Sequence, residues 1–333
     1  MKILLVNVDA RFNLAIRRMY NYFTQKGEEV TMIDLKLTAY PLRSGKPHHK
    51  DVDATGYDRV YVSNLFDINK DAVTVTGCDW VEYGGIGSNF PTNRLPDEIE
   101  STPPHYTSEE NTSVGFLTRG CIRNCWFCKV PKYEGKLKEY NKVEDIVQHK
   151  NAVFLDNNIL AYDKHLEVFQ WLIDHNIKCN FNQGLDWRLV NEKNLELLGK
   201  MRYISSYIFA FDDIKYQAGI EKVLPMIKKY LGHRCIGFYV YYHPSTPIHD
   251  LIYRCEWCRA HKCYPYIQRD ITCWDMPTDD KNFVIDWTSY VNQYAVFKKM
   301  TFEEFMKVRH EKDLDRRNKS IELYRKYSEG IKF

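Results

Sequence analysis

The sequence lacks long apolar runs and an excess of charge of either sign. No apolar stretch approaches the ~20 residues of a membrane-spanning helix, so we expect no membrane association. The 47 Lys and Arg nearly balance the 44 Asp and Glu, so overall charge does not indicate a nucleic-acid-binding protein. No signal peptide is predicted, because the apolar run at residues 3–6 is too short. We therefore expect a cytoplasmic protein whose ten cysteines are mostly reduced thiols or metal ligands.

The sequence does have an ordinary globular composition, with 44% apolar and 27% charged residues, which excludes general disorder. Its 24 tyrosines suit base stacking, although aromatic residues are more often plain core. Residues 298–333 carry 11 Lys and Arg against 7 Asp and Glu. That segment is interpreted either as a solvated amphipathic helix or as a basic docking surface for a phosphate-rich substrate.

The first 76 residues are predicted to form a small Rossmann-like domain. Residues 3–6, 30–33 and 59–62 are short apolar runs typical of buried parallel strands. Apolar residues recur at helical spacing between positions 14 and 23, which predicts a βαβ unit with a right-handed crossover. Glycine and proline interrupt residues 77–112, which we predict to be a linker.

Strands and helices alternate from residue 113 to residue 275. The strands are predicted at 114–117, 152–155, 179–182, 207–211, 235–242 and 263–268, and the helices at 143–150, 164–175, 192–201, 219–230 and 248–260. This α/β pattern predicts a partial (βα)6 TIM-type barrel, in which chemistry takes place at the carboxyl ends of the strands. Residues 276–333 are predicted to form a mainly helical extension.

Three cysteines follow the first strand of this second domain. Cys121, Cys125 and Cys128 have the spacing C-x3-C-x2-C. Zinc sites usually need four ligands in two separated pairs, whereas three clustered thiolates suit an iron–sulfur cube with one open iron. The segment resembles the cluster loop of the radical S-adenosylmethionine (SAM) superfamily, including an aromatic residue, Phe127, before the third cysteine.

The resemblance covers roughly residues 114–270, and it implies the cofactors and the chemistry. It implies that the three cysteines hold a [4Fe-4S] cluster and that SAM binds the fourth iron. In that superfamily the reduced cluster cleaves SAM to a 5′-deoxyadenosyl radical, which abstracts hydrogen from an organic substrate. The resemblance also implies a one-electron reductant such as flavodoxin or ferredoxin. We expect a small-molecule or nucleobase substrate, with nucleic acid as one candidate.

Polar residues after the later strands are candidates to bind SAM, together with the aromatic residue of the cluster loop. The candidates are Phe127, Asp156, Asn157, Asn158, Gln183, Asp186, Arg188 and Asp212. The superfamily's Gly-Gly-Glu motif is absent at residues 156–158, so these three are assigned by position alone. A guanidinium suits the SAM carboxylate. Asp186 could instead cap the next helix and pair with Arg188, and both interpretations stay open. No catalytic residue is identified.

The amino-terminal domain resembles the cobalamin-binding domain of one radical SAM class. The signature Asp-x-His-x-x-Gly is absent, because Arg11 stands where the histidine would be. A protonated guanidinium has no lone pair for cobalt, so cobalamin is not expected and the domain is interpreted as degenerate. The methylthiotransferase branch fits poorly, because its amino-terminal domain carries three cysteines and this one has only Cys78.

Four later cysteines could form a second cluster, namely Cys255, Cys258, Cys263 and Cys273. They fall on a predicted helix and strand, so core placement is the stronger interpretation. The sequence favours a radical SAM enzyme that starts a rearrangement or other modification, with a modified nucleobase in DNA as one concrete substrate. The alternatives are a cobalamin-dependent radical SAM methyltransferase and a non-catalytic metal-binding module.

Overall fold

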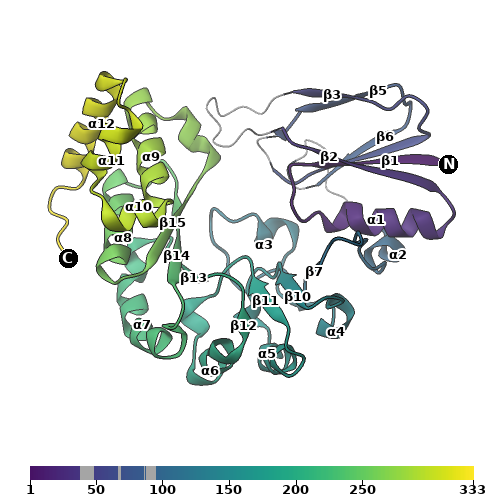
Figure 1. Cartoon of the computed structure of the whole chain (residues 1–333), viewed down its shortest axis with the longest axis horizontal. Coiled ribbons are helices and arrows are strands. Elements are labelled where there is room, and N and C mark those ends of the chain that lie inside the picture. The colour runs from purple at the N-terminus through teal and green to yellow at the C-terminus, as the bar shows by residue number, and fades with distance from the viewer. Residues whose placement is uncertain (38–48, 67–68, 86, 88–94) are drawn as a thin grey trace. The chain divides into compact units, whose positions relative to one another are not determined.

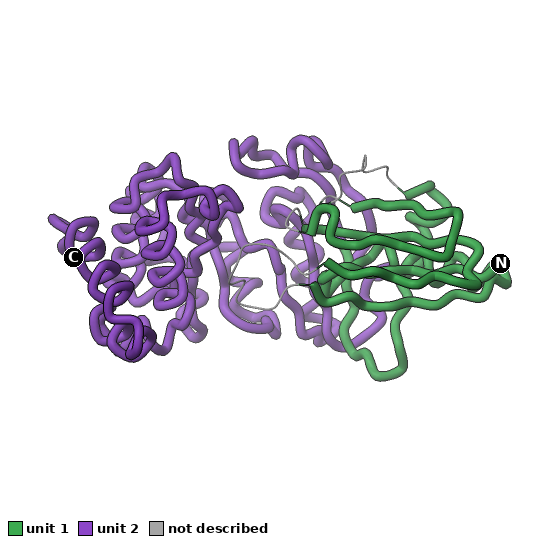
Figure 2. The backbone as a smooth tube through the Cα atoms, turned by 90° about the horizontal axis from the view of Figure 1, so that it is seen from above, with its two compact units in different colours: residues 1–115 green, residues 116–333 purple. Residues whose placement is uncertain are grey.

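A computed structural model describes residues 1–37, 49–66, 69–85, 87 and 95–333 (Figure 1). The chain forms two compact units, residues 1–115 and 116–333 (Figure 2). This division groups the described part of the predicted linker, 77–112, with the first unit. Residues 86 and 88–94 of that linker lie outside the described residues. Within the described ranges, no helix combines the length and apolar composition that crossing a bilayer requires.

The first unit is built on a four-stranded parallel sheet in the order β2-β1-β4-β6. The strands are β1 (Lys2–Val8), β2 (Glu29–Leu35), β4 (Arg59–Asn64) and β6 (Val81–Gly84), and helix α1 (Leu14–Gln25) connects β1 to β2. The three strands and the helix that the sequence predicted here are therefore confirmed.

Both faces of strand β1 are covered, which explains its continuous apolar sequence. Ile3 and Leu5 pack with Ile16 and other residues of α1. Leu4, Val6 and Val8 face the opposite way and belong to a second apolar cluster. A strand buried on both faces needs no alternation of polar and apolar residues.

Several short elements of the first unit were not predicted from the sequence. Strands β3 (Lys50–Asp53) and β5 (Val73–Thr76) form a parallel pair, and β6 and α2 (Asp97–Glu100) interrupt the predicted linker. Strand β7 (Thr112–Gly115) corresponds to the strand predicted at 114–117. The prediction of irregular structure was therefore wrong at residues 81–84. A short, half-buried edge strand has too weak a pattern to stand out beside Gly84 and Gly85.

The second unit carries the predicted alternation of strands and helices. One parallel sheet contains β10 (Asn151–Phe154), β11 (Lys178–Phe181) and β12 (Arg202–Tyr203), and the other contains β13 (Tyr207–Ala210), β14 (Ile236–Tyr242) and β15 (Tyr264–Arg269). The helices are α4 (Val143–Ile146), α5 (His165–Asp174), α6 (Glu192–Lys200), α7 (Gln217–Leu231) and α8 (Ile248–Ala260). The predicted elements are present, although the first helix is a single turn.

Residues 184 and 185 join the two sheets. Leu185 forms a parallel bridge with Phe209, and its amide donates to the carbonyl of Ile208 at 2.7 Å. Gly184 has φ +87°, and an added Cβ would lie 3.1 Å from the same carbonyl oxygen. The α/β class with parallel sheets is confirmed, while the Rossmann-like and partial TIM-type assignments stay predictions.

The predicted helical extension is confirmed. It contains α9 (Thr278–Val291), α10 (Tyr294–Lys299), α11 (Phe302–Arg309) and α12 (Leu314–Tyr327). The carboxylate of Asp286 on α9 is fully buried and accepts hydrogen bonds from Arg309, His310, Arg316 and Ser320. Burial favours a raised pKa for Asp286, but these donors outweigh burial and lower the pKa. The basic side chains of the extension thus help to hold its helices together.

Candidate functional site

The three predicted cluster ligands lie in one loop at the start of the second unit, which we call the cysteine loop (residues 120–137). It leaves the short strand β8 (Thr118–Arg119) and returns along β9 (Lys138–Glu139), which pairs antiparallel with β8. The amide of Cys121 donates to the carbonyl of Gly135 at 3.2 Å, and the amide of Cys128 donates to that of Cys125 at 3.0 Å. Backbone hydrogen bonds therefore close the loop at its base and fold it between the cysteines.

The base of the cysteine loop depends on Gly120 and Glu134. Gly120 has φ +81°, and an added Cβ would lie 2.2 Å from the carbonyl oxygen of Lys136. The Glu134 carboxylate accepts from the Gly120 amide at 2.9 Å and from Asn157 Nδ2 at 2.8 Å, and it pairs with Arg119 at 3.0 Å. The close backbone approach therefore requires glycine at position 120.

The three thiols are all half-buried and lie close enough to influence one another. Burial raises the pKa of Cys125 and Cys128, and nearby negative charge, including the other thiolates, raises it further. Backbone amides donate to two of the sulfurs, from Arg123 to Cys121 at 3.3 Å and from Val130 to Cys128. Such hydrogen bonds are among the features that tune iron–sulfur clusters.

Among the described residues, the three thiols are not placed around a single metal ion. In the described part of the chain, no three His, Cys, Asp or Glu side chains are placed to hold one ion. Each thiolate of a cubane binds a different iron, so a cubane takes ligands that lie further apart than those of a mononuclear site. The assignment of a cubane to these three thiols therefore stays a prediction.

Asp156 and Asn157, which follow strand β10, hold the base of the cysteine loop in place. Asp156 is fully buried and accepts from the amides of Leu117 (3.3 Å) and Thr118 (2.6 Å) and from the Thr118 hydroxyl (2.7 Å). Burial raises the pKa of Asp156 to about 6, although these donors oppose the rise. Asn157 contacts Glu134, as described above. Both side chains thus meet protein groups at the base of the loop.

Asp186 connects the cysteine loop to the end of strand β11. Its carboxylate accepts from Arg123 Nε at 2.8 Å, from Arg188 Nε at 2.6 Å and from Asn158 Nδ2 at 3.1 Å. It also caps the short 3-10 helix Trp187–Leu189 by accepting from the Arg188 amide. Burial favours a raised pKa for Asp186, but the two arginines outweigh burial and lower the pKa. The capping and pairing interpretation of Asp186 is therefore confirmed.

This arrangement leaves polar groups available beside the thiols. The Oδ1 atom of Asn158 is buried without a hydrogen-bond partner among the described residues. Arg188 uses its Nε for Asp186, while its terminal nitrogens make no hydrogen bond within the described part of the chain. Gln183 is exposed and likewise makes no side-chain hydrogen bond there. These three side chains can still bind a ligand.

Asp212 lies beside the thiols, because its charge contributes to the raised pKa of Cys125 and Cys128. It accepts from the amide of Tyr241 at 3.2 Å. Burial raises the pKa of Asp212 to about 6, opposed by the Tyr241 amide and by nearby arginines, including Arg188. Asp212 and Arg188 therefore interact electrostatically with each other and with Cys125.

Aromatic contacts join the cysteine loop to strand β14. The Phe127 ring stacks on Tyr241, with centroids 4.0 Å apart and planes 17° apart. The Tyr241 hydroxyl donates to Asp270 Oδ2 at 2.6 Å. Trp126 is 68% exposed and makes edge contacts with Tyr241 and His243. Phe127 thus anchors the loop, whereas its neighbour Trp126 faces solvent.

The four later cysteines are distributed over two core clusters. Cys258 and Cys263 pack in the cluster that also contains Phe238 and Trp257. Cys255 and Cys273 belong to the cluster beneath the helical extension. Cys255 and Cys258 lie on α8 and Cys263 immediately precedes β15, as the sequence predicted. Burial raises the pKa of all four thiols. They behave as small apolar core side chains.

The carboxyl ends of the strands in the first unit are joined by a polar network. Asn13 Nδ2 donates to Asn7 Oδ1 and to Ser63 Oγ, both at 2.9 Å. Asn7 Nδ2 in turn donates to Asp34 Oδ1 at 2.6 Å. Doubly wound sheets bind ligands at this edge. Arg11 is exposed and lies over the neighbouring ring of Phe12, 4.9 Å from its centroid.

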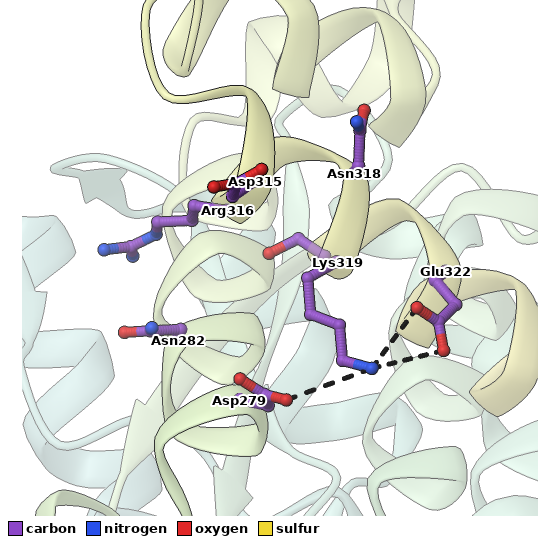
Figure 3. A pocket seen from close by; sticks show the side chains of 8 residues that line it. Asp279, Asn282, Asp315, Arg316, Asn318, Lys319 and Glu322 are labelled. Carbon is purple, nitrogen blue, oxygen red and sulfur yellow. Dashed lines mark hydrogen bonds and ion pairs between the residues drawn. The ribbon is translucent and has the colours of Figure 1, made fainter.

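A separate pocket of about 550 Å³ lies on the helical extension (Figure 3). It is lined by Asp279, Asn282, Asp315, Arg316, Asn318, Lys319, Ser320 and Glu322. Lys319 Nζ lies 3.2 Å from Glu322 Oε1 and 3.9 Å from Asp279 Oδ2, as Figure 3 shows. Lys319 thus pairs with two acidic residues of the lining, and Arg316 pairs with the buried Asp286. It contains none of the residues that the sequence predicted for the site.

Comparison with known proteins gives limited support for the superfamily. No family model matches the chain. A segment of 65 residues is 38% identical to a protein named "Putative methylthiotransferase" from Methanocaldococcus jannaschii. The match covers 19% of this chain and 13% of that protein. This short similarity loosely supports a relationship to radical SAM enzymes.

The sequence interpretation missed the residues that shape the cysteine loop. Gly120 and Arg123 stood within the recognised motif, but no role was assigned to them. Glu134 had a usable signal, since it is the one acidic residue between positions 119 and 138. An isolated acid among bases is a candidate for a structural ion pair. The stacking of Tyr241 on Phe127 had no sequence signal, because the two residues are far apart in the chain.

Proposed function

We propose that the chain is a radical SAM enzyme in which Cys121, Cys125 and Cys128 hold a [4Fe-4S] cluster. The observation that carries the proposal is the set of three half-buried thiols in one closed loop, beside polar groups from three strand ends. When bound, the reduced cluster and SAM supply a 5′-deoxyadenosyl radical that abstracts hydrogen from the substrate. The reaction that follows is a rearrangement or another modification of an organic molecule.

In this proposal the protein holds and orients the ligands. Arg188 binds the SAM carboxylate through its terminal nitrogens, because a guanidinium can donate two parallel hydrogen bonds to a carboxylate. Asn158 offers its buried Oδ1 as an acceptor for the SAM amino group. Asp186 positions both residues and does not need to touch SAM.

Aromatic side chains limit the access of water to the site. Phe127 stacks on Tyr241, and Tyr241 is held by Asp270, so these groups form a fixed wall beside Cys128. A site that produces a reactive radical needs such a wall to prevent side reactions. The remaining predicted ligands, Gln183 and Asp212, are proposed to contact the nucleoside part of SAM.

The test is anaerobic reconstitution followed by reduction with dithionite in the presence of SAM. We expect about four irons per chain and the release of 5′-deoxyadenosine. Replacing Cys121, Cys125 and Cys128 together with Ala should remove nearly all iron and all SAM cleavage. The control is the double variant Cys78→Ala and Cys235→Ala, which should keep both. A full cubane in the triple variant would contradict the assignment, and a chain that binds iron without cleaving SAM would be a non-catalytic metal-binding module.

Methylthio transfer is a second candidate, favoured by the similarity to the protein named as a methylthiotransferase. A sulfur-donating cluster would need further thiolates. The first unit has one cysteine, Cys78, and the four later cysteines are split between two core clusters. Iron analysis separates the candidates, because two cubanes would bring about eight irons per chain instead of about four.

A further inference from the structure

The cysteine loop is the most basic part of the second unit that lies near the proposed active site. Residues 119–142 contain seven Lys and Arg but two Glu. Five lysines of this segment are exposed, namely Lys129, Lys132, Lys136, Lys138 and Lys142. Lys132, Lys136 and Lys138 form no ion pair with any residue that the structure describes. Their charge is therefore available to a partner.

The helical extension is also basic, and part of its charge is paired inside the protein. Arg309 and Arg316 pair with the buried Asp286, and Arg325 pairs with Glu303 at 2.8 Å. With Lys319, four of the eleven Lys and Arg residues at positions 298–333 are thus paired within the described residues. The cysteine loop differs from the extension in its position, because it carries the three predicted cluster ligands.

An exposed aromatic ring accompanies these lysines. Trp126 lies between Cys125 and Cys128, and 68% of its surface is open to solvent. Its contacts with Tyr241 and His243 are edge-on, at interplanar angles of 76° and 88°. A large exposed ring costs solvation free energy, and such residues often mark binding surfaces.

The lysines and the tryptophan lie on one compact structure. Gly120 is packed against Lys136, and β9, which contains Lys138, pairs with the strand that leads into the loop. Lys129 interacts electrostatically with Lys132 and with Asp270. Asp270 is the acceptor of the Tyr241 hydroxyl, beside Trp126. The charged and aromatic groups therefore belong to the loop that carries the three thiols and to the strand that closes it.

We propose that this surface of the cysteine loop and of strand β9 binds single-stranded nucleic acid. Lys132, Lys136 and Lys138 contact phosphates, and Trp126 stacks on a base. Exposed lysines together with an exposed tryptophan favour this partner, because phosphates can pair with the lysines and unpaired bases can stack on the ring. A base in a duplex is covered by its neighbours and cannot reach such a ring without being flipped out. The inference rests on the proposed function, because we propose that the bound strand carries the base on which the radical SAM enzyme acts.

The experiment measures binding by fluorescence anisotropy with the reconstituted full chain. The probes are labelled single strands of DNA and of RNA, about 16 nucleotides long, together with the corresponding DNA duplex. We expect at least one single strand to bind more tightly than the duplex. Trp126→Ala should weaken that binding about tenfold, and Trp126→Phe should weaken it less, because stacking on an aromatic ring is partly retained.

Charge neutralisation tests the lysines. The test variant combines Lys132→Gln, Lys136→Gln and Lys138→Gln, and the matched control combines Lys178→Gln, Lys193→Gln and Lys222→Gln, which are exposed lysines outside the loop. The dependence of log affinity on log salt should fall by about 2 in the test variant, at about 0.7 per phosphate contact. The control should keep the slope of the unmodified chain. Iron content checks that each variant retains a folded loop.

Each outcome decides the proposal separately from the proposed function. Binding of either single strand with the expected effects supports it, even if SAM is not cleaved. Failure to bind any single strand overturns it, even if 5′-deoxyadenosine forms normally. Equal losses in the test and control variants also overturn it. If the loop lysines instead affect only the rate of SAM cleavage driven by an acidic electron-transfer protein, the surface belongs to that donor and the proposal is wrong.

Discussion

Replacing Asp186 with Asn tests whether one carboxylate holds the cysteine loop against the strand ends. Its two oxygens accept from Arg123, which lies between Cys121 and Cys125, and from Arg188 and Asn158. Asparagine has nearly the same shape but no charge. The variant therefore leaves two guanidinium groups without their counter-charge and keeps the backbone cap of Arg188 partly intact.

The expected loss of stability is about 2 kcal/mol. Removing one partner of a fully buried ion pair costs ~3–5 kcal/mol, whereas an exposed pair contributes at most ~1 kcal/mol. The Asp186 side chain is 5% exposed, but its arginine partners are 27% and 31% exposed. Water can therefore solvate the unpaired arginines in part, so the expected loss of stability lies between the values for a buried and an exposed ion pair.

Urea denaturation of the cluster-free chain measures this loss, and Asp213→Asn is the matched control. Asp213 caps a similar single turn, Ile214–Tyr216, but pairs only with the exposed Lys215. We expect the control to lose less than about 1 kcal/mol. The Asp186 variant should also retain less iron after reconstitution and gel filtration, because Arg123 no longer tethers the loop.

The pH dependence gives an independent check. The arginines lower the folded-state pKa of Asp186, so its stabilisation is present above the unfolded pKa and is lost as the pH falls through the folded value. The difference between the unmodified chain and Asp186→Asn should be constant from about pH 5 to pH 8 and shrink below about pH 4. Equal stability losses for the Asp186 and Asp213 variants, with unchanged iron retention, would refute the tethering role.

Four further predictions follow from the site and the core. Gly120→Ala should lower iron content severalfold, because its Cβ would meet the Lys136 carbonyl, and iron analysis after reconstitution measures this. Cys255→Ala with Cys258→Ala should destabilise the core but leave about four irons per chain, and a loss of half the iron would indicate a second cluster. Burial raises the pKa of Asp156 to about 6, so the native chain binds this proton more tightly than the unfolded chain. The free energy of unfolding should therefore fall by about 3 kcal/mol as the pH rises from about 4 to about 6. Urea titrations of Asp156→Asn should lack this fall. Hydroxocobalamin should neither stay bound through gel filtration nor raise the rate of SAM cleavage, and stoichiometric corrin absorbance would support the methyltransferase alternative.

The sequence was sufficient to predict the regular elements of the second unit. Buried parallel strands and amphipathic helices have strong local patterns, so all six predicted strands and five helices were found near their predicted positions. It also identified the three thiols, because their spacing is itself a local property. The short edge strand β6 was missed, since half-buried residues 81–84 resemble a loop.

The tertiary structure decided which polar residues face the thiols and which support the loop. The sequence offered Asp156, Asp186 and Asp212 as equivalent candidates after three strands. In the folded chain the Asp156 carboxylate accepts hydrogen bonds from backbone amides, and the Asp186 carboxylate accepts them from two arginines. Asp212 instead interacts electrostatically with Cys125. The residues that bury these carboxylates and bond to them lie far away in the sequence, and Arg123 is 63 residues from Asp186. Such long-range contacts determine both pKa and role, and no local pattern encodes them.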